Sequence, residues 1–161
     1  MLISAVGAGL LVGLALKGQL QRLAAISPKF ASLFAAAIAL HAVSSVALGD
    51  SFQRTAYFAS LCLLVLFLAV NLRLTAAPIA LLGASLNTLA VALYAGTMPV
   101  YSGAAERAGI QRPDVLHSVT SDFLVIGDVL PLPPFGTYSV GDVLLAVALF
   151  MFVVASMRVT E

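Results

Sequence analysis

The sequence predicts an all-α integral membrane protein: a single domain over residues 1–161, built as a bundle of five transmembrane helices with a structured outer loop. Composition is the first observation, because 61% of the 161 residues are apolar and only 9% are charged. Soluble domains contain about 45–50% apolar and about 25% charged residues, so this composition excludes an ordinary water-soluble fold and also excludes disorder. The second observation is that the apolar residues gather in five runs, which polar or charged segments separate.

A transmembrane helix needs about 17–25 largely apolar residues. The first run is short, and its positive charge at Lys17 follows the apolar residues, which is the reverse of the order in a signal peptide. The long connection over residues 96–139 forms the predicted outer loop. The five predicted spans cover residues 2–16, 30–48, 56–72, 76–95 and 140–157.

The placement of charge predicts the orientation. Six of the seven acidic residues fall on the side of the outer loop, and five of the eight basic residues fall on the opposite side. The positive-inside rule therefore predicts an outer N-terminus and a cytoplasmic C-terminus. The five basic residues are Lys17, Arg22, Lys29, Arg73 and Arg158.

Charge and cysteine content also limit the partners. The formal net charge is +1 and no long basic run is present, so nucleic acid has no electrostatic basis for binding. One cysteine, Cys62, excludes an internal disulfide framework and a cysteine cluster for zinc or iron–sulfur. We expect membrane lipids as partners, and neither a metal nor a cofactor.

Two short helices are predicted in the outer loop. Ser102 can cap the first helix, and Gly109 is a natural stop for it. The second is an amphipathic interfacial helix that starts at Asp114, because apolar residues recur at helical spacing over 116–126. We expect the loop to fold against the membrane surface and to bury Met98, Val100, Leu116, Phe123 and Ile126.

A short repeat surrounds two acidic residues. Gly-Asp-Val-Leu occurs at residues 127–130 and again at residues 141–144, with a stiff proline-rich stretch between them. The carboxylates of Asp128 and Asp142 can therefore face each other in an outer cleft, with His117 or Asp122 at its rim and Ser139 beside it. Paired carboxylates in a partly dehydrated site do not both ionise cheaply, and aspartic hydrolases use such a pair to activate water.

A structural interpretation of the same residues stays open. Ser139-Val140-Gly141-Asp142 matches a capping box, in which Asp142 fixes the start of the fifth span. Asp128 would then only end the interfacial helix in a turn. Within the spans, we expect the polar residues His41 and Asn87 to form hydrogen bonds between helices.

Over about its last 65 residues, through the motifs Gly127-Asp128 and Ser139-x-Gly141-Asp142, the chain resembles a bacterial membrane-protein family of unknown function. The resemblance implies a multi-pass protein of the bacterial cytoplasmic (inner) membrane and implies no activity. Its signature in this sequence is Gly127-Asp128 with Pro131 and Pro133, followed by Ser139-x-Gly141-Asp142, and preceded by Met98-Pro99-Val100, Glu106, Gly109 and His117.

In topology, the chain also looks loosely like lipoprotein signal peptidase, an aspartic membrane protease with four spans and an active site near the outer surface. That resemblance would put Asp128 and Asp142 in the two aspartate positions. The asparagine–aspartate–arginine motif of that family is missing before Asp128, and the first span is additional.

Two functions compete. The first is an aspartate-dyad hydrolase or transferase acting on a lipid-linked or membrane-embedded substrate at the outer face. Its catalytic residues would be Asp128 and Asp142, with His117, Asp122 and Ser139 at the rim or in binding. The second is a non-catalytic accessory or assembly subunit of a larger membrane complex. A transporter is disfavoured, because the spans hold few charges that could line a path.

Overall fold

The structure is a computed structural model, and it describes residues 1–46, 49–110 and 114–158. Seven helices and one four-stranded sheet are found in these residues. In chain order the elements are α1 (Leu2–Ala15), α2 (Leu20–Ala24), α3 (Ala31–Ser44), α4 (Asp50–Val70), α5 (Ala77–Leu93), β1 (Met98–Tyr101), α6 (Ser102–Ala108), β2 (His117–Thr120), β3 (Asp128–Pro131), β4 (Thr137–Ser139) and α7 (Val140–Met157).

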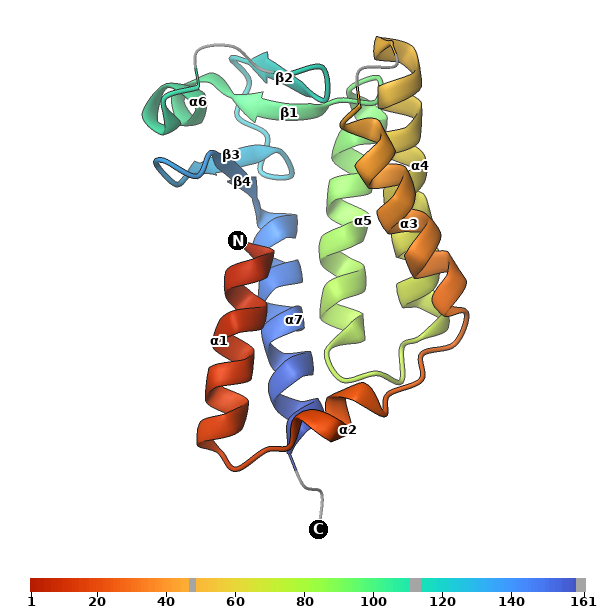
Figure 1. The fold of residues 1–161 in the computed structure, drawn as a ribbon. Helices are drawn as coiled ribbons and strands as arrows, with labels where there is room; N and C mark the ends of the chain where they lie inside the picture. The colour runs from red at the N-terminus through yellow and green to blue at the C-terminus, as the bar shows by residue number, and fades with distance from the viewer. Residues whose placement is uncertain (47–48, 111–113, 159–161) are drawn as a thin grey trace.

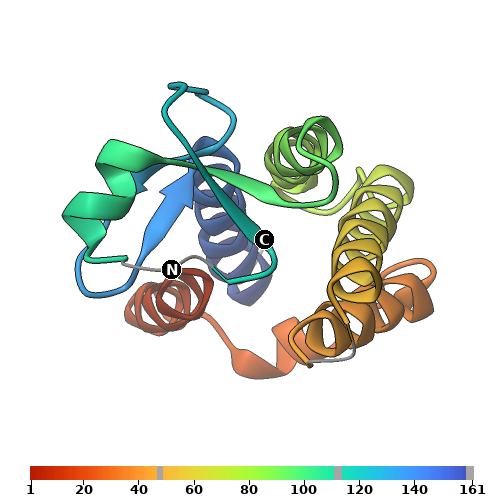
Figure 2. The ribbon, with the colours of Figure 1, turned by 90° about the horizontal axis from the view of Figure 1, so that it is seen from above.

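Five helices stand side by side, and the sheet lies across one end of them (Figure 1). Their packing order is α1–α7–α5–α4–α3, because each of these successive pairs is in contact. Seen from above, the order follows a curved row whose two ends are α1 and α3, and α2 runs between those ends away from the sheet (Figure 2). The sheet therefore covers one end of the space on the inner side of this row.

The five long helices occupy the five predicted spans, but they differ in length. Among the described residues, α4 and α7 are the two helices that are long and apolar enough to cross a membrane, with 21 and 18 residues. By contrast, α1 and α3 have 14 residues each, about 21 Å of helix against about 30 Å of hydrocarbon. The structure thus supports two spans by length, and α5, with 17 residues, comes close.

Glycines let α7 approach both of its neighbours closely. A Cβ atom added at Gly13 of α1 would lie 2.6 Å from the sulfur of Met157. On the other side of α7, a Cβ atom at Gly83 of α5 would lie 2.6 Å from the carbonyl oxygen of Gly141. Because neither position has room for a side chain, α7 packs almost backbone to backbone against α5 at its first turn.

The all-α prediction is wrong, because the outer loop forms a sheet in the order β2-β1-β3-β4. Strand β1 pairs in parallel with β2 and β3, and β3 pairs antiparallel with β4. The register places Asp128 opposite Ser139. Each strand has only three or four residues, so partner strands rather than local patterns determine where they form.

The prediction of an amphipathic helix that starts at Asp114 is also wrong. Its residues form β2 and a turn instead. The β-branched residues of β2 pair with β1, so the backbone N–H and C=O groups find hydrogen-bond partners without a helix. Phe123 is 63% exposed, against the expectation of burial. Met98 and Val100 on β1 are buried as predicted, whereas Leu116 and Ile126 are half-buried.

The first predicted loop helix is confirmed as α6. Gly109 ends it with a left-handed backbone (φ +74°), as its position predicted. The predicted cap is wrong, because Tyr101 occupies the N-cap position and Ser102 is the first helical residue, with no side-chain cap.

Candidate functional site

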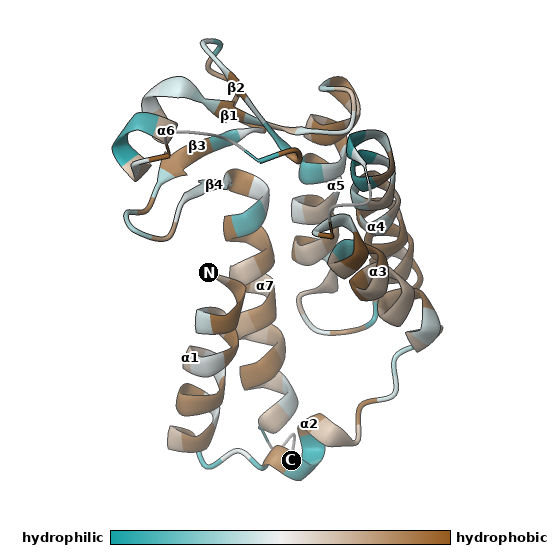
Figure 3. Ribbon diagram, turned by 45° about the horizontal axis from the view of Figure 1, so that its top comes forward, coloured by the Kyte–Doolittle hydropathy of each residue, from teal (hydrophilic) through white to brown (hydrophobic). Residues whose placement is uncertain are grey.

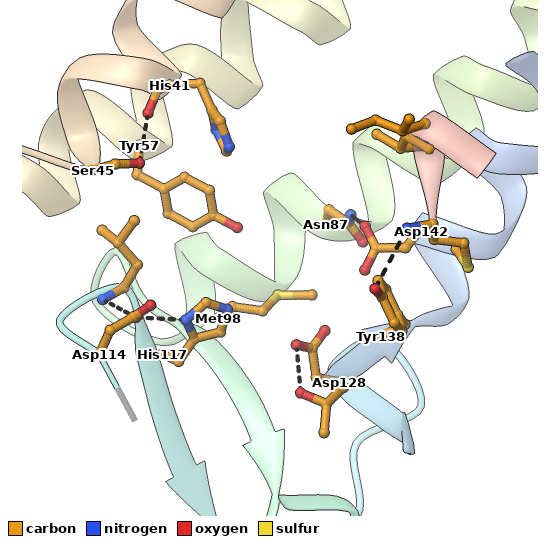
Figure 4. Close-up of a pocket in the computed structure, with 15 residues that line it drawn as sticks. His41, Ser45, Tyr57, Asn87, Met98, Asp114, His117, Asp128, Tyr138 and Asp142 are labelled. Carbon is orange, nitrogen blue, oxygen red and sulfur yellow. Dashed lines mark hydrogen bonds and ion pairs between the residues drawn. The ribbon is translucent and has the colours of Figure 1, made fainter. Parts of the chain in front are cut away.

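A cavity of about 560 Å³ lies under the sheet, at the inner face of the helix row (Figure 4). Residues from α1, α3, α4, α5, α7 and the sheet line it. Its volume falls within the range of about 300–1,000 Å³ that is typical of small-molecule sites. The polar lining residues are His41, Ser45, Tyr57, Asn87, Asp114, His117, Asp128, Thr137, Tyr138 and Asp142.

Asp142 begins α7 through a capping box, which confirms the structural interpretation of this motif. The hydroxyl oxygen of Ser139 accepts a hydrogen bond from the backbone N–H of Asp142 at 2.9 Å. In return, Oδ2 of Asp142 accepts a hydrogen bond from the backbone N–H of Ser139 at 3.0 Å. The positive end of the α7 dipole favours the ionised carboxylate at this position.

Asn87 of α5 completes this network from the neighbouring helix. Its Nδ2 donates to Oδ1 of Asp142 at 2.8 Å, and its Oδ1 accepts from the hydroxyl of Ser139 at 2.7 Å. The close approach of Gly83 and Gly141 brings the amide within reach, and a Cβ atom at Gly141 would collide with it. The predicted role of Asn87 as a hydrogen-bonding residue between helices is thus confirmed.

Asp128 is the buried acid of the cavity. It is the first residue of β3 and is only 4% exposed. Its Oδ2 accepts a hydrogen bond from the hydroxyl of Thr137 at 3.2 Å, and its Oδ1 is buried with no hydrogen-bond partner among the described residues. Burial, and then the negative charge of Asp142, raise the pKa of Asp128 to about 7, although His117 and Thr137 act in the opposite direction.

The side chains of His117 and Asp114 are hydrogen-bonded to each other at the cavity. The Nδ1 atom of His117 lies 2.6 Å from Oδ1 of Asp114, and this oxygen also accepts from the backbone N–H of Leu116. A carboxylate on Nδ1 favours the tautomer with a proton there, which leaves Nε2 as the acceptor. Across the cavity, the rings of His41 and Tyr57 lie 5.6 Å apart between α3 and α4.

The structure brings three of the predicted site residues to one cavity and places two elsewhere. Asp128, Asp142 and His117 line it, and Figure 4 shows the side chains of Asp128 and Asp142 on the same side of the cavity. Ser139 is fully buried behind Asp142, where it bonds to Asn87. Asp122 is exposed in the turn after β2 and is not a lining residue of the described cavity.

Sequence reasoning missed Tyr57 and Thr137 as residues of the site. Tyr57 lies within the long apolar helix α4, where a tyrosine is readily taken for packing. Thr137 reaches Asp128 only because β3 and β4 form a hairpin, and no local pattern announces that pairing. Among the described residues, no group of three or more His, Cys, Asp or Glu side chains is arranged to hold a metal ion.

Comparison with known proteins gives one relationship, and it covers most of the chain. Neither the curated proteins nor the solved structures give a significant match. The match to a protein family runs from the residue just before α2 to the last turn of α7, so it includes the whole sheet, Asp128, Asp142 and Asn87. The chain belongs to a family of unknown function, DUF5317, which it matches over residues 19–154.

Proposed function

We propose that this protein is a membrane-embedded hydrolase that uses Asp128 and Asp142 as a general acid–base pair. In this proposal all five long helices lie in the membrane, as expected from the sequence, and the sheet covers their outer end. Hydrophobic residues dominate the five helices, whereas hydrophilic residues gather near the sheet and on α2 (Figure 3). Large apolar side chains are also exposed on each of these helices, for example Ile3, Phe34, Leu66, Leu82 and Met151.

The observation that carries the proposal is the state of Asp128. Its Oδ1 is buried, has no hydrogen-bond partner among the described residues, and belongs to a side chain that lines the same cavity as Asp142. With a pKa of about 7, the carboxyl group holds a proton at neutral pH about half of the time. Acid–base catalysts work best when their pKa lies near the working pH, so this group is suited to proton transfer.

The two acids then have different roles. Asp142 accepts a proton from a water molecule whose oxygen attacks the carbonyl carbon of the substrate, while Asp128 donates its proton to the carbonyl oxygen. When the tetrahedral intermediate collapses, Asp142 gives its proton to the leaving group and Asp128 recovers a proton from the intermediate. The carbon–heteroatom bond breaks, an acid and an alcohol or amine form, and both aspartates return to their initial states.

The capping box does not prevent this role for Asp142. A carboxylate offers about four acceptor positions, and Asn87 and Ser139 occupy one on each oxygen. The remaining lone pairs are free to receive the proton of water. The cap and the amide instead fix the orientation of the carboxylate, which is what a positioned base requires.

Hydrolysis of 4-nitrophenyl palmitate and palmitoyl 4-nitroanilide in mixed micelles tests the proposal. The unmodified protein should release nitrophenol or nitroaniline, and Asp128→Asn should reduce the rate by about 10²–10⁴-fold, the usual contribution of a positioned acid. Asp122→Asn is the matched control, since Asp122 is an exposed acid of the same loop. Its rate should be unchanged.

Two outcomes would contradict the proposal that the protein is a hydrolase. One is equal rates in Asp128→Asn and the unmodified protein. The other is no turnover of either substrate together with recovery of a stoichiometric larger membrane protein in mild detergent. The second result would favour the accessory-subunit hypothesis.

A further inference from the structure

A second cavity lies along the inner face of the helix row, on the side of the first cavity away from the sheet. Its volume is about 310 Å³, and nearly all of its lining is apolar. Residues from α1, α3, α4, α5 and α7 contribute to it. They include Phe34, Phe67, Ala80, Leu145, Leu149 and Phe152.

The two cavities meet at Leu2. This residue of α1 lines both of them, so the apolar cavity and the polar cavity are neighbours. The polar cavity holds the acids at the sheet end, and the apolar cavity reaches the turn between α4 and α5, at the end of these helices away from the sheet. A polar cavity beside an apolar cavity matches the chemistry of a lipid, which has a polar head group and an apolar chain.

Helices α1 and α3 are the two ends of the helix row. Helix α1 packs on α7, and α3 packs on α4, but α1 and α3 are not a packed pair among the described residues. The views in Figures 1 and 2 agree that these two helices stand apart above α2. Leu2 is 44% exposed and Phe34 is 42% exposed, and both line the apolar cavity, so α1 and α3 each contribute a partly exposed side chain to its wall.

We propose that the substrate is a membrane lipid whose hydrocarbon chain occupies the apolar cavity, and that it enters sideways from the bilayer between α1 and α3. This inference rests on the proposed hydrolase, because it places the bond to be cleaved beside Asp128 and Asp142. A hydrocarbon chain in this apolar cavity needs no polar partner. Its binding is stabilised by about 25 cal/mol for each Å² of apolar surface that it buries.

The charges of the polar cavity restrict the head group. Three carboxyl groups and two histidines line it together with the N-terminal ammonium of Met1, which donates to the hydroxyl of Tyr138 at 3.5 Å, whereas no lysine or arginine side chain lines it among the described residues. A phosphate would be repelled by the carboxyl groups, which outnumber the one ammonium group that could pair with it. The head group is therefore uncharged or cationic.

The absence of tryptophan from the chain allows a direct test. Phe152→Trp places a single indole in the wall of the apolar cavity at little cost in volume. Met151→Trp places it one residue away at the same depth, on a side chain that is 40% exposed. Each variant, in detergent, is titrated with a brominated alkyl glycerol ether, which quenches indole fluorescence and has no bond for a hydrolase to cleave.

Quenching of the Phe152→Trp variant should saturate at about one ether per chain, whereas quenching of the Met151→Trp variant should follow only the fraction of brominated molecules in the micelle. A brominated alkyl phosphate should quench the first variant at least tenfold less tightly. Ala80→Phe, added to the Phe152→Trp variant, should abolish the saturable phase by filling the cavity. Ala92→Phe, an exposed position on the same helix, should leave it intact.

Unsaturable quenching in both variants would overturn the chain site, and tighter binding of the phosphate would overturn the head-group assignment. Phe34→Trp, on the opposite wall, is a second reporter if the Phe152→Trp variant does not fold. Because binding is scored without turnover, these results do not depend on the hydrolase assay. A saturable site without hydrolysis would refute the proposed function and keep the lipid site.

Discussion

Asn87 holds the first turn of α7 against α5, and its replacement by alanine should destabilise the protein strongly. The side chain is 5% exposed and makes two hydrogen bonds, one from its Nδ2 to the carboxylate of Asp142 and one from the hydroxyl of Ser139. A neutral hydrogen bond contributes about 0.5–1.5 kcal/mol, and one to a charged group about 1.5–3 kcal/mol. We therefore expect Asn87→Ala to reduce the free energy of unfolding by about 2–4 kcal/mol.

Reversible unfolding in mixed micelles of a mild detergent and SDS, followed by circular dichroism, measures this loss. Thr88→Ala is the matched control, because Thr88 is the next residue and its hydroxyl bonds only to the carbonyl of Ala84 in its own helix. The control should change the free energy by less than about 1 kcal/mol. If the two variants unfold alike, the network between the helices contributes nothing, and the reasoning about Asp142 fails with it.

Three further predictions concern the pKa of Asp128, the packing of α7 and the orientation of the protein in the membrane. Folding raises the pKa of Asp128 from 3.8 to about 7, so the folded state binds the extra proton and the free energy of unfolding should fall by about 4 kcal/mol as pH rises from 4 to 8. Denaturant titrations at several pH values should show that slope and its loss in Asp128→Asn; a slope unchanged in that variant would contradict the assignment. Gly141→Ala should prevent α7 from seating on α5 and lower the yield of folded protein in size-exclusion chromatography. Gly7→Ala, where an added Cβ meets nothing within 4 Å, should be neutral or stabilising by up to about 1 kcal/mol, and equal damage from both changes would refute the packing argument. Finally, Arg107→Cys in a Cys62→Ser background should react with a membrane-impermeant maleimide in intact cells, and a need for lysis would reverse the predicted orientation.

What could be predicted from the sequence depended on how local the responsible contacts are. The capping box at Ser139 and Asp142 lies within four residues, and Gly109 acts on the helix that it directly follows, so both could be recognised from the order of residues. The helix positions followed from the apolar runs in the same way. The lengths of the helices could not be predicted in this way, because the residue at which a helix ends depends on the turn that follows as well as on the hydrophobicity of the segment.

The sheet could not be predicted, because its contacts are distant in sequence. Strand β2 exists through pairing of Met98 with His117, and the spacing of Leu116 and Val119 happens to suit a helix equally well. The link between Asn87 and Asp142 spans 55 residues. Asp128 and Asp142 were found as candidates through their shared Gly-Asp-Val-Leu motif, but nothing local indicated that Thr137 and Tyr57 share their cavity.

The pairing of Asp128 with Ser139 has a consequence for how the site tolerates change. Asp128 stands opposite Ser139 on the antiparallel ladder, and Ser139 is the N-cap of the helix turn that carries Asp142. The pairing of Asp128 with Ser139 and the first turn of α7 therefore set the spacing of the two acids. The hairpin tip over residues 132–136 does not contribute to this spacing. That tip is free to vary in length or sequence without altering the relative position of the acids. Asp128 and Asp142 therefore keep their relative position when the hairpin tip changes, because β3, β4 and the first turn of α7 fix it.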